Sequence, residues 1–260
     1  MNLFNELIAS EFTVGKFELA YVHLQDVLEN ANSLDDKFTA YSYKIKTFAE
    51  GENRDYNKGV VVGLQICKMY GTILPNSPKR TDLIQASVKL ETKLRNRPLT
   101  VLSKLPRTEV PTVFRVLKEV QYYAVLEGNN DLAALITKKA ICLSLQKNCI
   151  SKDMVSILAM HVSLVLKDIS KAKLAYAYAN ATEKTSEVFR EDKGLYYQVQ
   201  MELHGGIYPL LRPHRESMDP IINSHRPLLN AGNIEYAIGG GICYAQAWLC
   251  AGLPLNSPLL

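Results

Sequence analysis

Histidine and arginine side chains gather in one part of the sequence, where together they could bind an anion. The members of this cluster are His204, Arg212, His214, Arg215, His225 and Arg226. Guanidinium and imidazolium groups donate charge-assisted hydrogen bonds to phosphate and carboxylate groups. The same stretch holds two glycines and three prolines between Gly205 and Pro220, which is typical of a surface loop. We therefore interpret the cluster as a solvated basic loop in preference to an anion site.

Five cysteines are the next candidates, because thiolates bind metals and act as nucleophiles. Four of them form pairs seven residues apart, Cys142 with Cys149 and Cys243 with Cys250. On a helix that spacing is about 10 Å, too far for one metal ion, whereas zinc ligands usually lie two to four residues apart. We expect core cysteines and no metal site. The odd count, with no signal peptide at Met1–Glu6, predicts a reducing, cytoplasmic location.

No sequence motif for nucleotide binding or covalent catalysis is present. Gly239-Gly240-Gly241 follows no predicted strand, and Tyr244 stands where a dinucleotide loop needs its third glycine. The G-x-x-x-x-G-K-[ST] phosphate loop and the kinase H-R-D and D-F-G motifs are missing. The sequence therefore predicts no catalytic residue and no cofactor. An all-α enzyme whose site is assembled from distant residues stays open as an alternative.

A basic segment is the strongest candidate for binding. Between Pro75 and Glu119 there are ten lysines and arginines against four acids, whereas the rest of the chain sums to −2. We expect a helix opened by Thr81-Asp82, with Ile84 and Val88 on the side away from most charges. The candidate docking residues are Lys79, Arg80, Lys93, Arg95 and Arg97.

This segment has two interpretations, a solvated helix face or a docking surface for an acidic partner. Nucleic acid is not expected, because no aromatic residue interleaves with the charges to stack on bases.

Helical periodicity predicts the elements that position these residues. Apolar residues from Phe17 to Leu28 recur on one face of a helix, and Gly15 supplies a turn before it. Ser33-Leu34-Asp35-Asp36 predicts a capped start for a second helix through Phe38 to Phe48. No sustained two-residue alternation occurs, so we expect an all-α fold.

A polar turn followed by one large apolar residue recurs along the chain. These anchor residues are Phe17, Tyr56, Leu132, Ile169 and Ile234. Their intervals of 39, 76, 37 and 65 residues fit a period near 38, with one copy missing and an irregular last interval. That period is close to the roughly 34 residues of a tetratricopeptide unit. We expect each anchor to fill the groove between two helices.

The predicted architecture is a tetratricopeptide-like superhelix of antiparallel helix pairs, an α-solenoid. We expect a single helical-repeat domain over residues 1–260, forming part of a longer chain, with a possible sub-boundary near 71–80. The run from Ala237 to Gly252 is apolar, but spanning a bilayer needs about 20 such residues. We interpret it as a tightly packed buried helix and expect no membrane contact.

Four short segments, in order, resemble a known region. They are Tyr70-Gly71-Thr72-Ile73-Leu74-Pro75, Asn96-Arg97-Pro98-Leu99-Thr100-Val101-Leu102-Ser103-Lys104-Leu105-Pro106, Ala231-Gly232-Asn233-Ile234-Glu235-Tyr236-Ala237 and Cys250-Ala251-Gly252-Leu253-Pro254-Leu255. The chain is similar to the tetratricopeptide-like region that follows the AAA-type ATPase domain of large multidomain signalling proteins. The resemblance implies an upstream protein-kinase-like domain and ATPase, and downstream GAF and histidine-kinase or cyclase modules.

Together these observations predict a non-catalytic scaffold that mediates protein–protein or interdomain interaction in signal transduction. Its partner would be a protein, a peptide or the flanking domains of the same chain. A free-standing tetratricopeptide-like adaptor is the alternative within the same class.

Overall fold

The computed structural model describes residues 2–33, 37–51, 54–108 and 112–254, and it is all-α. Helix makes up 78% of the structure, and no strand forms among the described residues. The predicted all-α class is therefore confirmed. The first half of the chain holds α1 (Asn2–Thr13), α2 (Phe17–Asn30), α3 (Phe38–Glu50), α4 (Tyr56–Met69), α5 (Arg80–Leu94), the 3₁₀ helix η1 (Leu99–Lys104) and α6 (Thr112–Leu126). The second half holds α7 (Asn130–Lys147), α8 (Lys152–Leu166), η2 (Ile169–Lys171), α9 (Ala172–Glu187), α10 (Lys193–Glu202), η3 (Leu203–Ile207), η4 (Tyr208–Leu210), α11 (Arg215–Asn230) and α12 (Ile234–Cys250).

The chain forms two compact units, and neither is continuous in sequence. Unit 1 comprises Met1–Lys93 and Thr108–Gln146, and unit 2 comprises Leu94–Arg107 and Lys147–Leu260. The sub-boundary expected near residues 71–80 therefore lies inside unit 1. The chain passes from one unit to the other after Lys93, Arg107 and Gln146.

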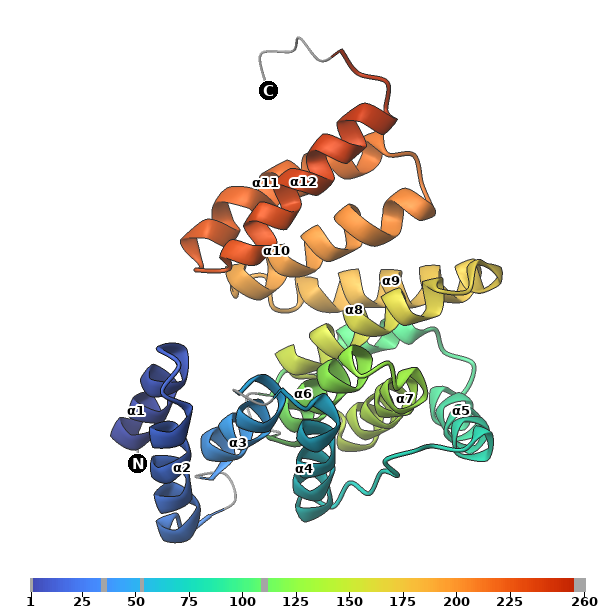
Figure 1. Ribbon diagram of the computed structural model, residues 1–260. Coiled ribbons are helices and arrows are strands. Elements are labelled where there is room, and N and C mark those ends of the chain that lie inside the picture. The colour runs from blue at the N-terminus through green and yellow to red at the C-terminus, as the bar shows by residue number, and fades with distance from the viewer. Residues whose placement is uncertain (1, 34–36, 52–53, 109–111, 255–260) are drawn as a thin grey trace. The chain divides into compact units, whose positions relative to one another are not determined.

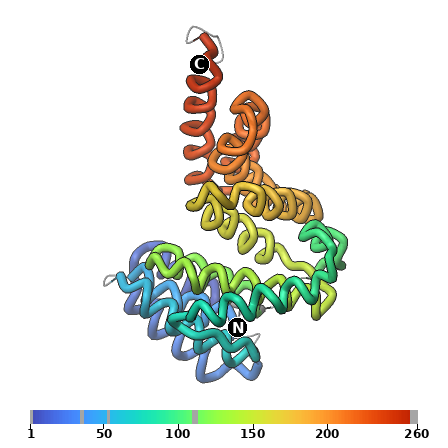
Figure 2. Tube along the Cα trace, turned by 90° about the vertical axis from the view of Figure 1, so that its right-hand side faces the viewer, coloured from blue at the N-terminus to red at the C-terminus, as the bar shows by residue number. Residues whose placement is uncertain are grey.

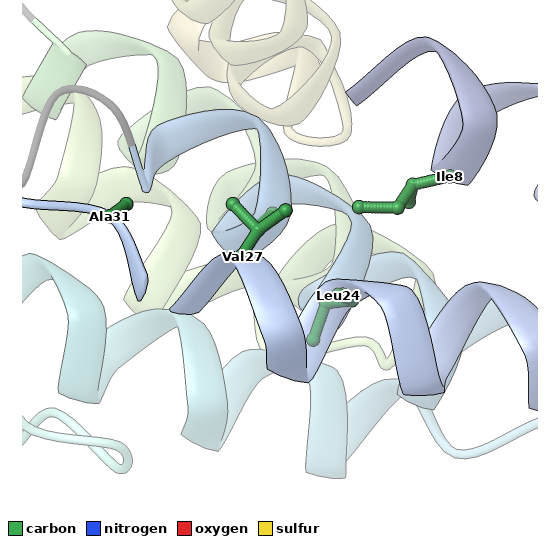
Figure 3. Packing of buried hydrophobic residues seen from close by; sticks show 5 residues of the cluster. Ile8, Leu24, Val27 and Ala31 are labelled. Atoms are coloured by element: carbon green, nitrogen blue, oxygen red, sulfur yellow. The ribbon is translucent and has the colours of Figure 1, made fainter. Parts of the chain in front are cut away.

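Unit 1 is built from helices that pack on their neighbours in the chain. Contacts join α1 to α2, α2 to α3, and α3 and α4 to α6. At its N-terminal end a small core of aliphatic residues fixes the first three helices (Figure 3). Its members are Ile8, Leu24, Val27, Ala31 and Ala40. Burial of each of the three larger side chains, Ile8, Leu24 and Val27, stabilises the fold by roughly 1.5–3 kcal/mol.

Unit 2 follows the same plan of sequential packing. Contacts join α8 to α9, α9 to α10, α10 to α11 and α11 to α12, and η1 packs on α9. Figure 1 and Figure 2 both show α11 and α12 side by side, with the turn at Gly232 between them. Gly232 has φ +78°, and Gly15 in the turn between α1 and α2 has the same value, as a left-handed turn residue requires.

The anchor residues mark helix starts, but not all of them fill grooves. Phe17, Tyr56 and Ile234 are the first residues of α2, α4 and α12. Leu132 is fully buried near the start of α7, whereas Ile169 and Ile234 are 66% and 59% exposed. The expectation that each anchor packs between two helices is therefore wrong at the last two sites.

The second predicted helix is confirmed as α3, which begins at Phe38. The proposed capping residues Leu34 to Asp36 lie outside the described residues. Asp55 does cap the next helix, since its side chain accepts a hydrogen bond of 2.8 Å from the Lys58 backbone N–H.

The interpretation of the Ala237–Gly252 run as a buried helix is only half right. Gly240 is buried, and a Cβ there would lie 3.3 Å from Met201 Cγ, so close packing explains this glycine. On the other side, however, Ile238, Ile242 and Leu249 are more than half exposed. The helix therefore buries one face and presents a second apolar face to solvent.

The cysteines also divide between core and surface. Cys67 and Cys142 are buried, Cys149 and Cys243 are half-buried, and Cys250 is exposed. Because α7 ends at Lys147, Cys142 and Cys149 do not share a helix face. The core expectation is therefore wrong for Cys250.

Candidate functional site

A groove between α5 and α7 in unit 1 lies beside the basic segment. Its volume is about 350 Å³, at the small end of the 300–1,000 Å³ typical of ligand pockets. The floor is apolar, formed by Ala86, Leu135 and Cys142, and Ile73 lies at the rim with 71% of its surface exposed. We call this feature the α5–α7 groove.

Lysines dominate the polar lining of the α5–α7 groove. Lys89 comes from α5, while Lys138 and Lys139 come from α7 and are half-buried. Long lysine stems can cover apolar surface while the ammonium groups stay in water, which suits a groove with this floor. Among the described lining residues Asp82 is the one carboxylate, so the groove carries an excess of positive charge.

Asp82 has a structural task at the start of α5. Its Oδ2 accepts a hydrogen bond of 2.8 Å from the Lys79 backbone N–H. Backbone N–H groups at the start of a helix have no acceptor within the helix, and Asp82 supplies one of them with a partner. A carboxylate in the first turn also suits the helix dipole. The acid is therefore engaged by the backbone of its own helix.

The pKa of the Cys142 thiol reflects the electrostatics of the groove floor. Burial raises the pKa of its thiol, and the ammonium groups of Lys89, Lys93 and Lys139 partly counteract that rise. The net shift is upward, so the thiol is protonated at neutral pH and is a poor nucleophile. The groove is therefore suited to binding an anion next to apolar groups, and not to thiolate chemistry.

The predicted docking residues do not form one cluster. Lys79 and Arg80 are exposed at the start of α5, and Lys93 lies half-buried in its last turn near the groove. Arg95 and Arg97 follow the end of α5 and belong to unit 2. Lys93 thus lies close enough to act on the Cys142 thiol of the groove floor, whereas the last two arginines belong to the other unit.

The turn that carries Arg95 and Arg97 ends α5. Arg95 and Asn96 have φ values of 49° and 61°, a left-handed pair that is uncommon for residues other than glycine. The Arg97 backbone N–H and its Nε both donate to the Leu94 carbonyl, at 2.9 Å and 3.0 Å. Arg97 thereby satisfies a helix-end carbonyl.

The predicted orientation of α5 is wrong. Ile84 and Val88 are 53% and 56% exposed, whereas Ala86 and Leu90 are buried. Two apolar pairs lie on opposite sides of this helix, and the smaller pair faces the core. Lys89 is exposed and also lines the groove beside α7.

Lys138 and Lys139 were missed by the sequence interpretation. They lie about 50 residues beyond Lys89, within an otherwise apolar stretch of α7. A lysine doublet inside such a stretch is the one signal that could have identified them.

The histidine and arginine cluster of unit 2 is not a solvated loop. The stretch forms a π-helical turn, a 3₁₀ turn and most of the first half of α11, which contains Pro220 and Pro227. His204 is buried, with Nε2 3.8 Å from Glu183 Oε1. A Cβ at Gly205 would lie 3.1 Å from Cys243 Sγ, so glycine permits this close approach of α12.

Glu183 is the centre of this polar group, which we call the Glu183 cluster: Tyr176, Glu183, His204, Tyr208 and Arg212. The Tyr208 hydroxyl donates to Glu183 Oε2 at 2.7 Å. The Arg212 guanidinium lies 3.9 Å from the Tyr208 ring centroid and donates to the Tyr176 hydroxyl at 3.0 Å. The nearby His204 imidazole, and then the hydrogen bond from Tyr208, lower the pKa of Glu183 despite its partial burial.

Two other members of the histidine and arginine cluster, His225 and Arg215, lie outside the Glu183 cluster. His225 Nδ1 is 2.9 Å from the Ala237 carbonyl, and Arg215 donates to the Ala251 carbonyl at 3.2 Å, so both tie α11 to α12 and its end. Since both carboxylate oxygens of Glu183 are engaged within unit 2, the arrangement favours a structural role over an anion site.

Within the described ranges, no group of three or more His, Cys, Asp or Glu side chains could hold a metal ion. No helix in the described part of the chain is long and apolar enough to cross a membrane.

Comparison of the chain with protein-family models, with characterised proteins and with solved structures finds no match.

Proposed function

We propose that this chain is a non-catalytic interaction module of a signalling protein, and that the α5–α7 groove holds an acidic segment of its partner. The partner is another protein or a flanking domain of the same chain. The observation that carries the proposal is the groove itself, whose lysines surround an apolar floor. A short segment with alternating acidic and apolar residues would satisfy both parts of that lining.

The helical pairs support a tetratricopeptide-like arrangement as the scaffold for this groove. The contacts between consecutive helices include α1 with α2, α3 with α4, α8 with α9, and α11 with α12. Each pair has an anchor residue at or just before the start of its second helix. In such arrays each unit contacts its neighbours and one face stays available for a ligand. The cytoplasmic location and the link to ATPase and kinase domains belong to the same proposal and rest on the resemblance described above.

The test uses a short fluorescein-labelled peptide of alternating glutamate and leucine, titrated with the full chain at low salt. We expect saturable binding that weakens as salt rises, because screening shortens the reach of exposed charges to about 8 Å at physiological ionic strength. Lys89→Glu combined with Lys139→Glu should weaken binding at least about tenfold, a loss of about 1.4 kcal/mol.

The matched control reverses two lysines of unit 1 that do not line the groove, Lys16 and Lys68, both of which are exposed. The net charge then changes by the same amount. Equal losses in the two double variants would show that only net charge matters, and the groove assignment would be wrong. Circular dichroism of each variant checks that the helices are retained.

A further inference from the structure

Helix α12 lies at the edge of unit 2 (Figures 1 and 2), and its outer face is apolar. We call it the α12 stripe: Ile234, Ile238, Gly241, Ile242, Ala245 and Leu249. Neighbouring members of this set are one, three or four residues apart, which places them all on one face of the helix. The four large side chains are 59%, 57%, 59% and 60% exposed, and none of the six residues is charged.

The α12 stripe does not serve the core of its own unit. The opposite side of the helix supplies that core, through Ala237, Ala247 and Trp248, which are at least nine-tenths buried. Exposed apolar residues are common singly, but a continuous row of them marks an interaction surface. Glu235 and Gln246 flank the row, where a helix lying on a membrane surface would carry lysines and arginines. The occupant is therefore more plausibly an apolar protein surface than a lipid surface.

The order of large and small residues shows which protein surface fits. If two α12 helices run antiparallel about a point between Gly241 and Ile242, each stripe residue faces a defined partner. Ile238 then faces Ala245 of the other copy, and Ile242 faces Gly241 of the other copy. Large residues thus lie over small ones near the centre, as close helix packing requires. At the ends Ile234 faces Leu249, so apolar contact continues along the stripe.

We propose that a second copy of this chain docks on the α12 stripe and forms a two-fold dimer with antiparallel α12 helices. In a two-fold interface residue i contacts residue j and residue j contacts residue i, and the stripe has this reciprocal pattern. A different partner helix would not require the stripe to be complementary to itself. The proposal concerns unit 2 and is independent of the α5–α7 groove.

The expected strength of the dimer follows from the size of the stripe. α12 has 17 residues, so the contact is about 25 Å long at 1.5 Å per residue. One helix against one helix buries less than the roughly 800 Å² per partner of a standard interface. We therefore expect a concentration-dependent dimer with a dissociation constant in the micromolar range, about 1–100 μM.

Sedimentation equilibrium of the full chain across this concentration range tests the proposal. The mass should rise from 29.1 kDa toward twice that value. Ile238→Lys, which puts a charge at the centre of the stripe, should keep the chain monomeric throughout. Ile84→Lys is the matched control, because Ile84 is an equally exposed isoleucine within a helix of unit 1.

An exchange of two residues tests the antiparallel register. Ile238→Ala removes a large residue and Ala245→Ile fills the space opposite it, so each single change should weaken the dimer at least about tenfold. The double exchange restores one large and one small residue at each contact and should return most of the affinity. In a parallel dimer each position faces itself, so the double exchange would put two alanines together at position 238 and two isoleucines together at position 245, and no contact of a large residue with a small one would form.

Three results would overturn the proposal. One is a mass of 29.1 kDa at every concentration, and another is a dimer that Ile238→Lys leaves intact. The third is a double exchange that is no better than its single variants. Because these side chains are exposed, thermal melting followed by circular dichroism should be nearly unchanged in each variant.

Discussion

The α5–α7 groove and the Glu183 cluster both combine charged side chains with buried apolar neighbours, but they use the charge differently. In the Glu183 cluster the carboxylate contacts the Tyr208 hydroxyl and lies near His204, and Arg212 lies on the Tyr208 ring. In the groove three lysines line a cavity that contains one carboxylate, and that carboxylate caps α5.

Charge that is satisfied within a fold stabilises it, whereas like charges gathered around a cavity attract a partner of opposite charge. The comparison therefore predicts opposite effects on stability and on binding when charge is removed from the two regions.

The largest effect on stability is expected from Glu183→Ala. This change leaves the partly buried Tyr208 hydroxyl and His204 without their carboxylate partner. A loss of about 2 kcal/mol in the free energy of unfolding is expected, a moderate value because the Glu183 side chain is 30% exposed. Urea unfolding measured by circular dichroism gives this value directly.

The counterpart in the groove is Lys89→Ala, for which we expect a change within about 0.5 kcal/mol. A large loss from Lys89→Ala, or none from Glu183→Ala, would remove the distinction between the two regions.

A smaller effect should appear as acid sensitivity. The pKa of Glu183 is lowered in the folded chain, so its contribution to stability is complete above the unfolded value near 4.5 and is lost as pH falls through the lower folded value. Glu183→Gln removes this titration. The variant should therefore be less stable than the native chain at neutral pH, and the difference should shrink as the pH falls below 4.5. Unfolding curves at neutral pH and at successively more acidic pH values measure this difference, and a constant difference would contradict the assignment.

The smallest effect is expected from the two arginines that follow α5. Arg95→Glu combined with Arg97→Glu should weaken binding of the glutamate–leucine peptide by about two- to threefold at low salt, which is less than 1 kcal/mol. Both residues are exposed and do not line the groove, so they act on a ligand there only through long-range charge. The loss should shrink as salt rises. A loss as large as that from Lys89→Glu with Lys139→Glu would place the docking surface on the turn instead of the groove.

The helices themselves were predictable, because period and turn residues are local properties. Phe17 and Tyr56 mark helix starts correctly, and Gly15 and Gly232 have the left-handed backbone that a turn requires. The choice of buried face was not predictable for α5, since Ile84 and Val88 form as good a stripe as Ala86 and Leu90. Only the surface that receives the helix decides between them.

The two polar regions depend on contacts between residues far apart in sequence. Lys139 meets the groove through the packing of α7, about 50 residues beyond Lys89. His204 is buried although glycines and prolines follow it. Gly205 lets Cys243 approach, and the proline-rich stretch continues into α11. Local composition indicated a loop there because it does not report which distant helix covers a segment.

The segment Leu94–Arg107 lies between two parts of unit 1 in the sequence but belongs to unit 2. Its helix η1 packs on α9, Arg107 pairs with Glu191, and the Ile150 backbone N–H donates to the Pro106 carbonyl at 2.9 Å. During synthesis on the ribosome this segment emerges before every partner that holds it, and fully buried Leu102 must wait for α9. No cut at a single position separates the two units from each other. A stop codon after residue 146 would complete unit 1 but leave an unsatisfied apolar segment within it, and such a product is expected to aggregate or to be degraded.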